Sequence, residues 1–81
     1  MFQVDEQVEI KGYIGGTFVA VINKQLVTLP INQETKTGII TKVIPGPVYS
    51  FMIKFICYEF PIEVSIDNIT KCSTEYFRVI F

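Results

Sequence analysis

Residues branched at Cβ dominate this chain at the expense of good helix formers. The sequence contains nine valines and thirteen isoleucines but only one alanine and two leucines. Valine and isoleucine lose side-chain freedom in a helix, whereas they pack well on the pleated surface of a sheet. Alanine and leucine, which favour helices most strongly among the apolar residues, are almost missing. The composition therefore predicts an all-β protein.

The length of 81 residues predicts a single domain that spans residues 1–81. Hydrophobic residues make up 49% of the chain and charged residues only 19%. A chain of this size buries roughly 60% of the surface that it exposes when unfolded. Some of the apolar side chains are therefore expected at the surface or against another chain.

Several functional classes are excluded by what the composition lacks. Without histidine, the chain has no histidine-dependent catalytic triad, histidine-containing zinc site or histidine pH switch. A formal net charge of −1 disfavours general phosphate binding, which requires an excess of Lys and Arg. Cys57 and Cys72 are too few for a tetrahedral thiolate site and are expected to be ordinary thiols. We predict neither a metal nor a cofactor.

The most apolar stretch, residues 38–62, does not predict a membrane helix. It is interrupted by three charged residues and three prolines, whereas a spanning helix needs about 20 mainly apolar residues. The first ten residues carry acidic side chains where a secretory signal carries basic ones. We therefore expect a cytoplasmic protein without a membrane partner, or one in the host cytoplasm if it is encoded by a phage.

Apolar runs of alternating pattern, separated by turn-forming residues, place the strands. Gly12, Gly15 and Gly16 interrupt the first two runs, and a turn of sequence Pro-Gly-Pro ends the fourth. Pro30 cannot donate a ladder hydrogen bond, so its run should end there or lie at a sheet edge. The runs predicted as strands are 4–10, 17–22, 26–31, 38–44, 48–60, 62–66 and 76–81.

Four segments carry a resemblance to known families: VDEQVEI (4–10), TGIITKV (37–43), YSFMIKF (49–55) and IDNI (66–69). They resemble the corresponding parts of KOW-type domains and of the small barrel proteins typified by the ferredoxin-docking component of photosystem I. The resemblance implies a small SH3-like barrel of about five strands, with the 17–31 hairpin added in its first long loop. It also implies inward-facing Ile39 and Val43 and a one-turn helix at 67–69. The basic residues through which those families bind RNA or ferredoxin are mostly missing, so neither role is carried over.

The sequence predicts no enzymatic activity. Glu59 and Glu63 flank Pro61 and are interpreted as solvated carboxylates, because so small a barrel offers little cleft for a substrate. Cys57 has no histidine to activate it and is expected on a buried strand face, where a thiol is inert. The glycine-rich stretch 12–16 lacks the lysine that follows a phosphate-binding loop.

The favoured hypothesis is a non-catalytic protein–protein interaction module. Aromatic residues are enriched at the centres of interfaces, where each buries a large area at low entropic cost. Tyr13, Tyr49, Tyr58 and Phe60 lie in or beside predicted turns and are expected to form a partner-binding cluster. The small size and the lack of catalytic residues also suit a phage- or mobile-element-encoded inhibitor of a host or defence protein.

A second hypothesis is self-association, or a structural role as an accessory component of a larger complex. The 17–31 hairpin would present apolar strand surface with few protecting charges, and so would Met52, Ile56, Phe77 and Phe81. A symmetric homo-oligomer would bury that surface and account for the excess of apolar residues. Under this hypothesis Ile56→Lys should yield a soluble monomer.

A third hypothesis is an RNA- or ribosome-associated domain of the KOW type, although the net charge makes nucleic acid an unfavourable partner. It requires five basic residues to gather on one face despite that charge. These residues are Lys36, Lys42, Lys54, Lys71 and Arg78.

Overall fold

The structure is a computed structural model that describes residues 2–72. It is all-β, with seven strands in one antiparallel sheet and a single turn of 3-10 helix, η1. The elements are β1 (Gln7–Ile10), β2 (Thr17–Ile22), β3 (Gln25–Pro30), β4 (Thr37–Ile44), β5 (Ser50–Lys54), β6 (Ile62–Ser65), η1 (Ile66–Asn68) and β7 (Ile69–Lys71). The all-β prediction is confirmed, and residues 2–72 form seven strands, where a barrel of about five with an added hairpin was predicted.

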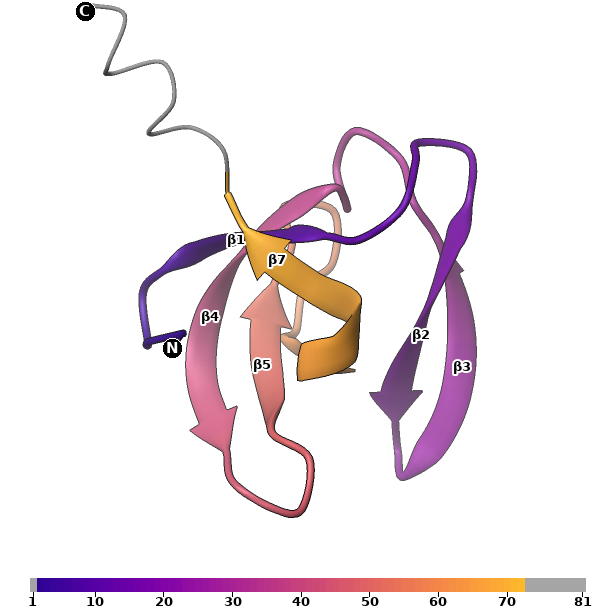
Figure 1. Cartoon of the computed structure of the whole chain (residues 1–81). Helices are drawn as coiled ribbons and strands as arrows, with labels where there is room; N and C mark the ends of the chain where they lie inside the picture. The colour runs from indigo at the N-terminus through magenta and orange to yellow at the C-terminus, as the bar shows by residue number, and fades with distance from the viewer. Residues whose placement is uncertain (1, 73–81) are drawn as a thin grey trace, which may run out of the picture.

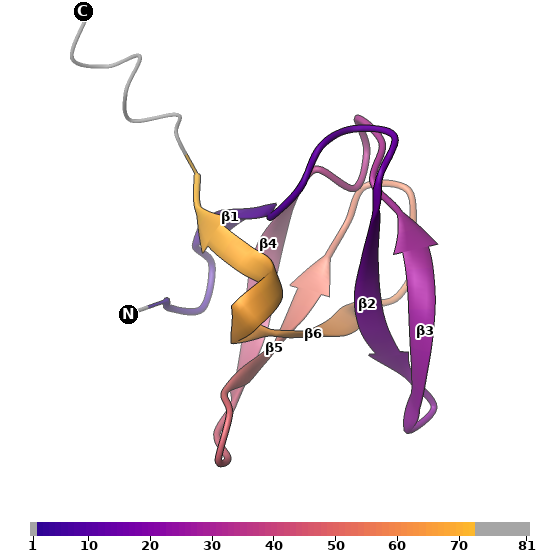
Figure 2. The same ribbon diagram turned by 45° about the vertical axis from the view of Figure 1, so that its right-hand side comes forward.

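The strand order in the sheet is β3-β2-β6-β5-β4-β1-β7. β4, β5 and β6 form a meander of sequential antiparallel strands. β1 pairs with both β4 and β7, which lie beside it in Figure 1. β6, the last strand of this meander, lies between β5 and the β2–β3 hairpin (Figure 2). Only one register pair, Val21 with Glu63, joins β2 to β6. The hairpin is thus attached to the sheet by few backbone contacts.

Alternation of side chains along the strands builds the hydrophobic core. Val8 and Ile10 face inward from β1, and Ile62 and Val64 face inward from β6, as their alternating patterns predict. Phe55 contributes from the loop that follows β5. The buried hydrophobic residues are Val8, Ile10, Phe18, Ala20, Ile31, Ile40, Phe51, Ile53, Phe55, Ile62, Val64 and Ile69.

Two predicted strands are shorter in the structure. The 48–60 run forms a strand only over Ser50–Lys54, because the ladder with β4 ends at the pair of Ile39 and Lys54 and β6 begins only at Ile62. The 4–10 run is extended only from Gln7, since Asp5 has a φ of 72° and turns the chain. The predicted 76–81 strand lies outside the described residues, and the last strand described is β7.

The two strands of the hairpin lie close to their predicted bounds, and the turn between them has two residues rather than the predicted three. β2 spans 17–22 as predicted, while β3 begins at Gln25 and ends at Pro30 on an edge of the sheet. Asn23 and Lys24 form a two-residue turn with φ values of 53° and 65°. Positive φ at both positions is typical of the type I′ turn, whose twist matches that of the flanking strands.

The family resemblance implied that Ile39 and Val43 face inward, which is wrong for Ile39 and confirmed for Val43. Ile39 is 40% exposed, whereas its neighbour Ile40 is fully buried. A register shift between Ile40 and Lys42 then reverses the alternation, so that Val43 packs against the core. The short helix η1 covers 66–68 rather than 67–69, and the Ser65 hydroxyl caps it by accepting a hydrogen bond from the Asp67 N–H.

An ion pair fastens the start of the chain to β7. Lys71 Nζ lies 2.6 Å from Glu6 Oε2 and also 4.9 Å from the centre of the Phe2 ring. The hydrogen bond from Lys71 lowers the pKa of the Glu6 carboxyl from its ordinary value.

Gly38 lies where the side chains of β5 and its following loop leave no room for a Cβ. An added Cβ would overlap Cγ2 of Ile53 and approach the Lys54 carbonyl oxygen to 3.1 Å. We expect Gly38→Ala to lower the free energy of unfolding by about 1–3 kcal/mol, as overpacking of a core does. Urea denaturation measures this change.

Gly46→Ala is the matched control, because a Cβ at Gly46 meets nothing nearer than the Val48 carbonyl oxygen at 3.6 Å. Its stability should stay within about 0.5 kcal/mol of the wild type. Equal losses for the two variants would contradict the steric explanation.

Candidate binding groove

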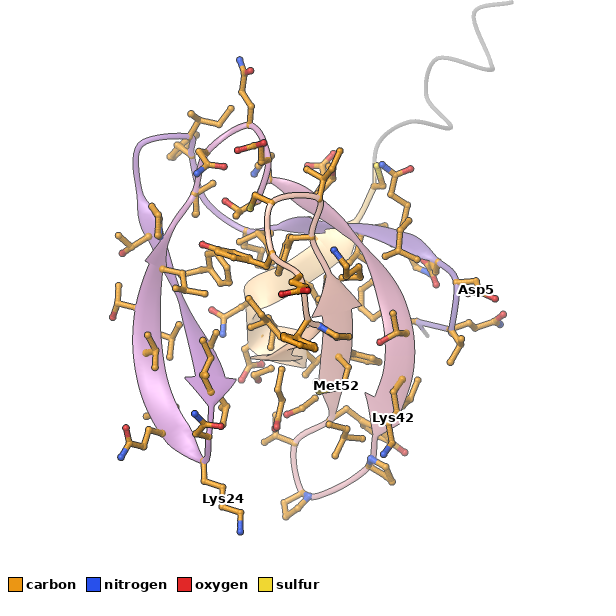
Figure 3. The ribbon with its side chains drawn as sticks, turned by 180° about the vertical axis from the view of Figure 1, so that it is seen from behind. Asp5, Lys24, Lys42 and Met52 are labelled. Carbon is orange, nitrogen blue, oxygen red and sulfur yellow. The ribbon has the colours of Figure 1, made fainter. Side chains whose placement is uncertain are left out.

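An open groove with a volume of about 630 Å³ separates the β2–β3 hairpin from the segment that leads into β6. Met52 lies on the sheet between the hairpin and β4, as seen from behind in Figure 3, and contributes to the groove. The lining side chains are mainly apolar, with charged residues among them. The groove is lined by Val21, Ile22, Asn23, Lys24, Leu29, Met52, Tyr58, Glu59, Phe60, Pro61, Ile62 and Glu63.

The loop over residues 55–61 positions the aromatic side of the groove. Phe55 is fully buried, and the Tyr58 ring packs edge-on against it with ring centres 6.1 Å apart. Lys54 Nζ donates to the Phe55 carbonyl oxygen at 2.6 Å and also to that of Tyr58. A backbone hydrogen bond of 3.3 Å from the Tyr58 N–H to the Phe55 oxygen closes the turn. The loop is therefore fixed at its base, while the Phe60 side chain beyond it is 74% exposed.

The groove contains two of the four aromatic residues predicted to bind a partner. Tyr58 and Phe60 line it together. Tyr13 is 88% exposed in the loop before β2 and does not line the groove. Tyr49 lies just before β5, where its carbonyl oxygen accepts a hydrogen bond from the Ile66 N–H, and it also lies outside the groove.

The residues predicted for self-association are also separated. Met52 lines the groove, so it belongs with Tyr58 and Phe60. Ile56 is 83% exposed and borders a second, smaller hollow that also contains Ile39. Phe77 and Phe81 lie outside the described residues.

Sequence reasoning assigned the hairpin to a self-association surface and did not predict that it lies beside Tyr58 and Phe60. Val21, Ile22 and Leu29 line one side of the groove. The signal that could have identified them is the charge pattern, since Lys24 is the only charged residue between positions 12 and 33. Such a long uncharged stretch in a small domain indicates surface that meets other apolar groups.

Three of the lysines required by the RNA-binding hypothesis are engaged within the chain. Lys36 Nζ donates to the carbonyl oxygens of Ile10 and Gly12 at 2.7 and 2.6 Å. Lys54 holds the loop after β5, and Lys71 pairs with Glu6. These ammonium groups have partners that a phosphate would have to displace. Arg78 lies outside the described residues.

The structure corrects the expected position of Cys57. This thiol is exposed in the loop after β5, not on a buried strand face, because β5 ends at Lys54. Cys57 and Cys72 are both free. Within residues 2–72, no three His, Cys, Asp or Glu side chains gather as a metal site would require. Glu59 and Glu63 both line the groove.

Comparison with family models, with curated proteins and with solved structures finds no match to this chain. Over the described part of the chain, no helix has the length and apolar character to cross a membrane.

Lys54 is expected to stabilise the loop that carries Tyr58. Lys54→Met keeps an aliphatic side chain but removes the ammonium group. The carbonyl oxygens of Phe55 and Tyr58 then lose the hydrogen bonds that Lys54 donates to them. We expect the free energy of unfolding to fall by about 1–2 kcal/mol, the scale of a hydrogen bond from a charged group. Lys42→Met is the control, since Lys42 is an exposed lysine of β4. Chemical denaturation compares the two, and equal stability of both variants would contradict the role of Lys54.

Proposed function

We propose that this chain is a non-catalytic protein–protein interaction module, which binds an apolar segment of another protein in the groove beside the β2–β3 hairpin. The observation that carries the proposal is the joining of Met52, Tyr58 and Phe60 in one groove of about 630 Å³. A concave, mainly apolar surface with aromatic anchors is the usual form of a binding site.

The nature of the groove indicates the chemistry of its ligand. Phe60 is largely exposed and supported by a fixed loop, so it can bury a large area without a costly rearrangement. Lys24 lies at one part of the wall, while Glu59 and Glu63 lie at another. A short apolar segment with polar groups of both signs on its flanks would complement these walls.

The strand pairing supports an SH3-like arrangement as the scaffold for this role. β1 pairs with both β4 and β7, β4 to β6 form a meander, and one turn of 3-10 helix precedes β7. In this arrangement the β2–β3 hairpin occupies the long loop between β1 and β4. The RNA-binding alternative receives less support, because Lys36, Lys54 and Lys71 are held by partners within the chain.

Phe60→Ala tests the groove directly. Peptides would be selected from a displayed random library on the full chain and then titrated against the wild type and variants. Loss of a central aromatic anchor should weaken binding at least tenfold, or about 1.4 kcal/mol. The fold should remain intact, because the Phe60 side chain is 74% exposed.

Tyr13→Ala is the matched control, since Tyr13 is a more exposed aromatic residue that does not line the groove. It should bind the same peptides with unchanged affinity. Equal affinity of the wild type and Phe60→Ala, or a loss confined to Tyr13→Ala, would overturn the proposed site. Tyr58→Ala would be a poorer probe of the groove, because Tyr58 also packs against the core.

A further inference from the structure

Among residues 2–72, β3 is an edge of the seven-stranded sheet and pairs only with β2 (Figure 1). Exposed edge strands are usually protected by charges, bulges or short length. β3 has six residues and no charged side chain, and its only protective residue is Pro30 at its end. The opposite edge, β7, has three residues, of which Lys71 pairs with Glu6. The β3 edge is therefore less protected than the β7 edge against pairing with a strand of another chain.

The turn geometry determines which backbone groups of β3 face the free edge. Ile22 and Gln25 flank a two-residue turn and form its closing, hydrogen-bonded pair. Because bonded and non-bonded pairs alternate along an antiparallel ladder, Val27 and Leu29 also point their backbone groups at β2.

The intervening residues, Leu26 and Thr28, point their N–H and C=O groups away from β2. Pro30 falls in the same outward series. Its carbonyl oxygen accepts a hydrogen bond of 2.8 Å from the Thr35 hydroxyl rather than one from β2, in agreement with this assignment. Leu26 and Thr28 therefore offer two donors and two acceptors at the edge.

We propose that β3 pairs antiparallel with β3 of a second copy of this chain, about a two-fold axis through Val27. In this register Leu26 of each copy lies opposite Thr28 of the other, and each such pair exchanges two backbone hydrogen bonds. The dimer thus gains four backbone hydrogen bonds. Val27 meets its own copy directly at the axis, as a close non-hydrogen-bonded pair.

A second copy suits this edge because the edge is complementary to itself. Leu26 and Thr28 stand symmetrically about Val27, so a two-fold rotation brings donors onto acceptors. The strand holds no charge to repel its copy, and Lys24 lies outside the paired residues at opposite ends of the two strands. Leu26, which is 78% exposed in the single chain, would pack beside Thr28 of the second copy.

Amide hydrogen exchange of the full chain, measured by NMR at several concentrations, tests this register. Raising the concentration from about 10 µM to about 1 mM should slow exchange at Leu26 and Thr28 at least threefold, because dimer formation is concentration-dependent. The amides of Val27 and Leu29 already bond to β2 and should change much less. A dimer in which the Leu26 and Thr28 amides do not slow would overturn the proposal.

Leu26→Lys provides the second test, read by light scattering of the full chain. It places two like charges at diagonal positions across the proposed pairing and should weaken dimerisation at least tenfold. Ile56→Lys introduces the same charge at a similarly exposed site away from β3 and should leave the dimer mass, twice 9.3 kDa, unchanged. Thr28→Pro, which removes an edge donor, should act like Leu26→Lys.

The outcomes separate this proposal from groove binding. A wild type that stays at 9.3 kDa at every concentration overturns the β3 pairing, as does a dimer lost in Ile56→Lys but kept in Leu26→Lys. Leu26 does not line the groove, so Leu26→Lys should retain the affinity for groove-binding peptides. Each proposal can therefore fail while the other stands.

Discussion

The packing of Phe55 between Phe18 and Tyr58 is the contact on which the rest of this structure depends. The ring centres lie 5.8 and 6.1 Å from that of Phe55, which is fully buried. β2 and β6 share only one register pair, so the hairpin is held to the sheet mainly by side chains. Aromatic packing of this kind stabilises through both buried area and ring geometry. The same contact fixes the loop and the hairpin as the two walls of the groove.

Two lysines donate hydrogen bonds to backbone carbonyl oxygens that are not paired within the sheet. Lys36 binds two carbonyl oxygens at the end of β1, and Lys54 binds two in the loop after β5. Backbone groups away from a ladder need such partners when water has limited access. This use of charge has a functional consequence, because these ammonium groups are engaged within the chain. In the two interactions proposed above, recognition uses apolar side chains and the backbone groups of an edge strand instead.

The β2–β3 hairpin carries part of the apolar surface that the chain leaves exposed, through Val19, Ile22 and Leu26. Lys24 is its only charge, and the hairpin contributes both to the groove and to an edge of the sheet. The two proposed interactions use different groups of this hairpin. Groove binding uses side chains such as Leu29, whereas the dimer uses the backbone of Leu26 and Thr28. Hydrophobic residues make up 49% of the 81 residues, and the two proposed interactions would cover part of the apolar surface that remains exposed.

The sequence alone determined the all-β class and a hairpin whose second strand ends at Pro30. It also determined the buried faces of β1 and β6, because side chains alternate between the two faces of a strand. It could not determine where β5 ends. Apolar alternation continues past Lys54, but a strand extends only as far as neighbouring strands supply hydrogen bonds. Nor could it bring Met52, Phe60 and the hairpin into one groove while leaving Tyr13 outside. That grouping joins residues distant in the chain, and only tertiary packing decides it.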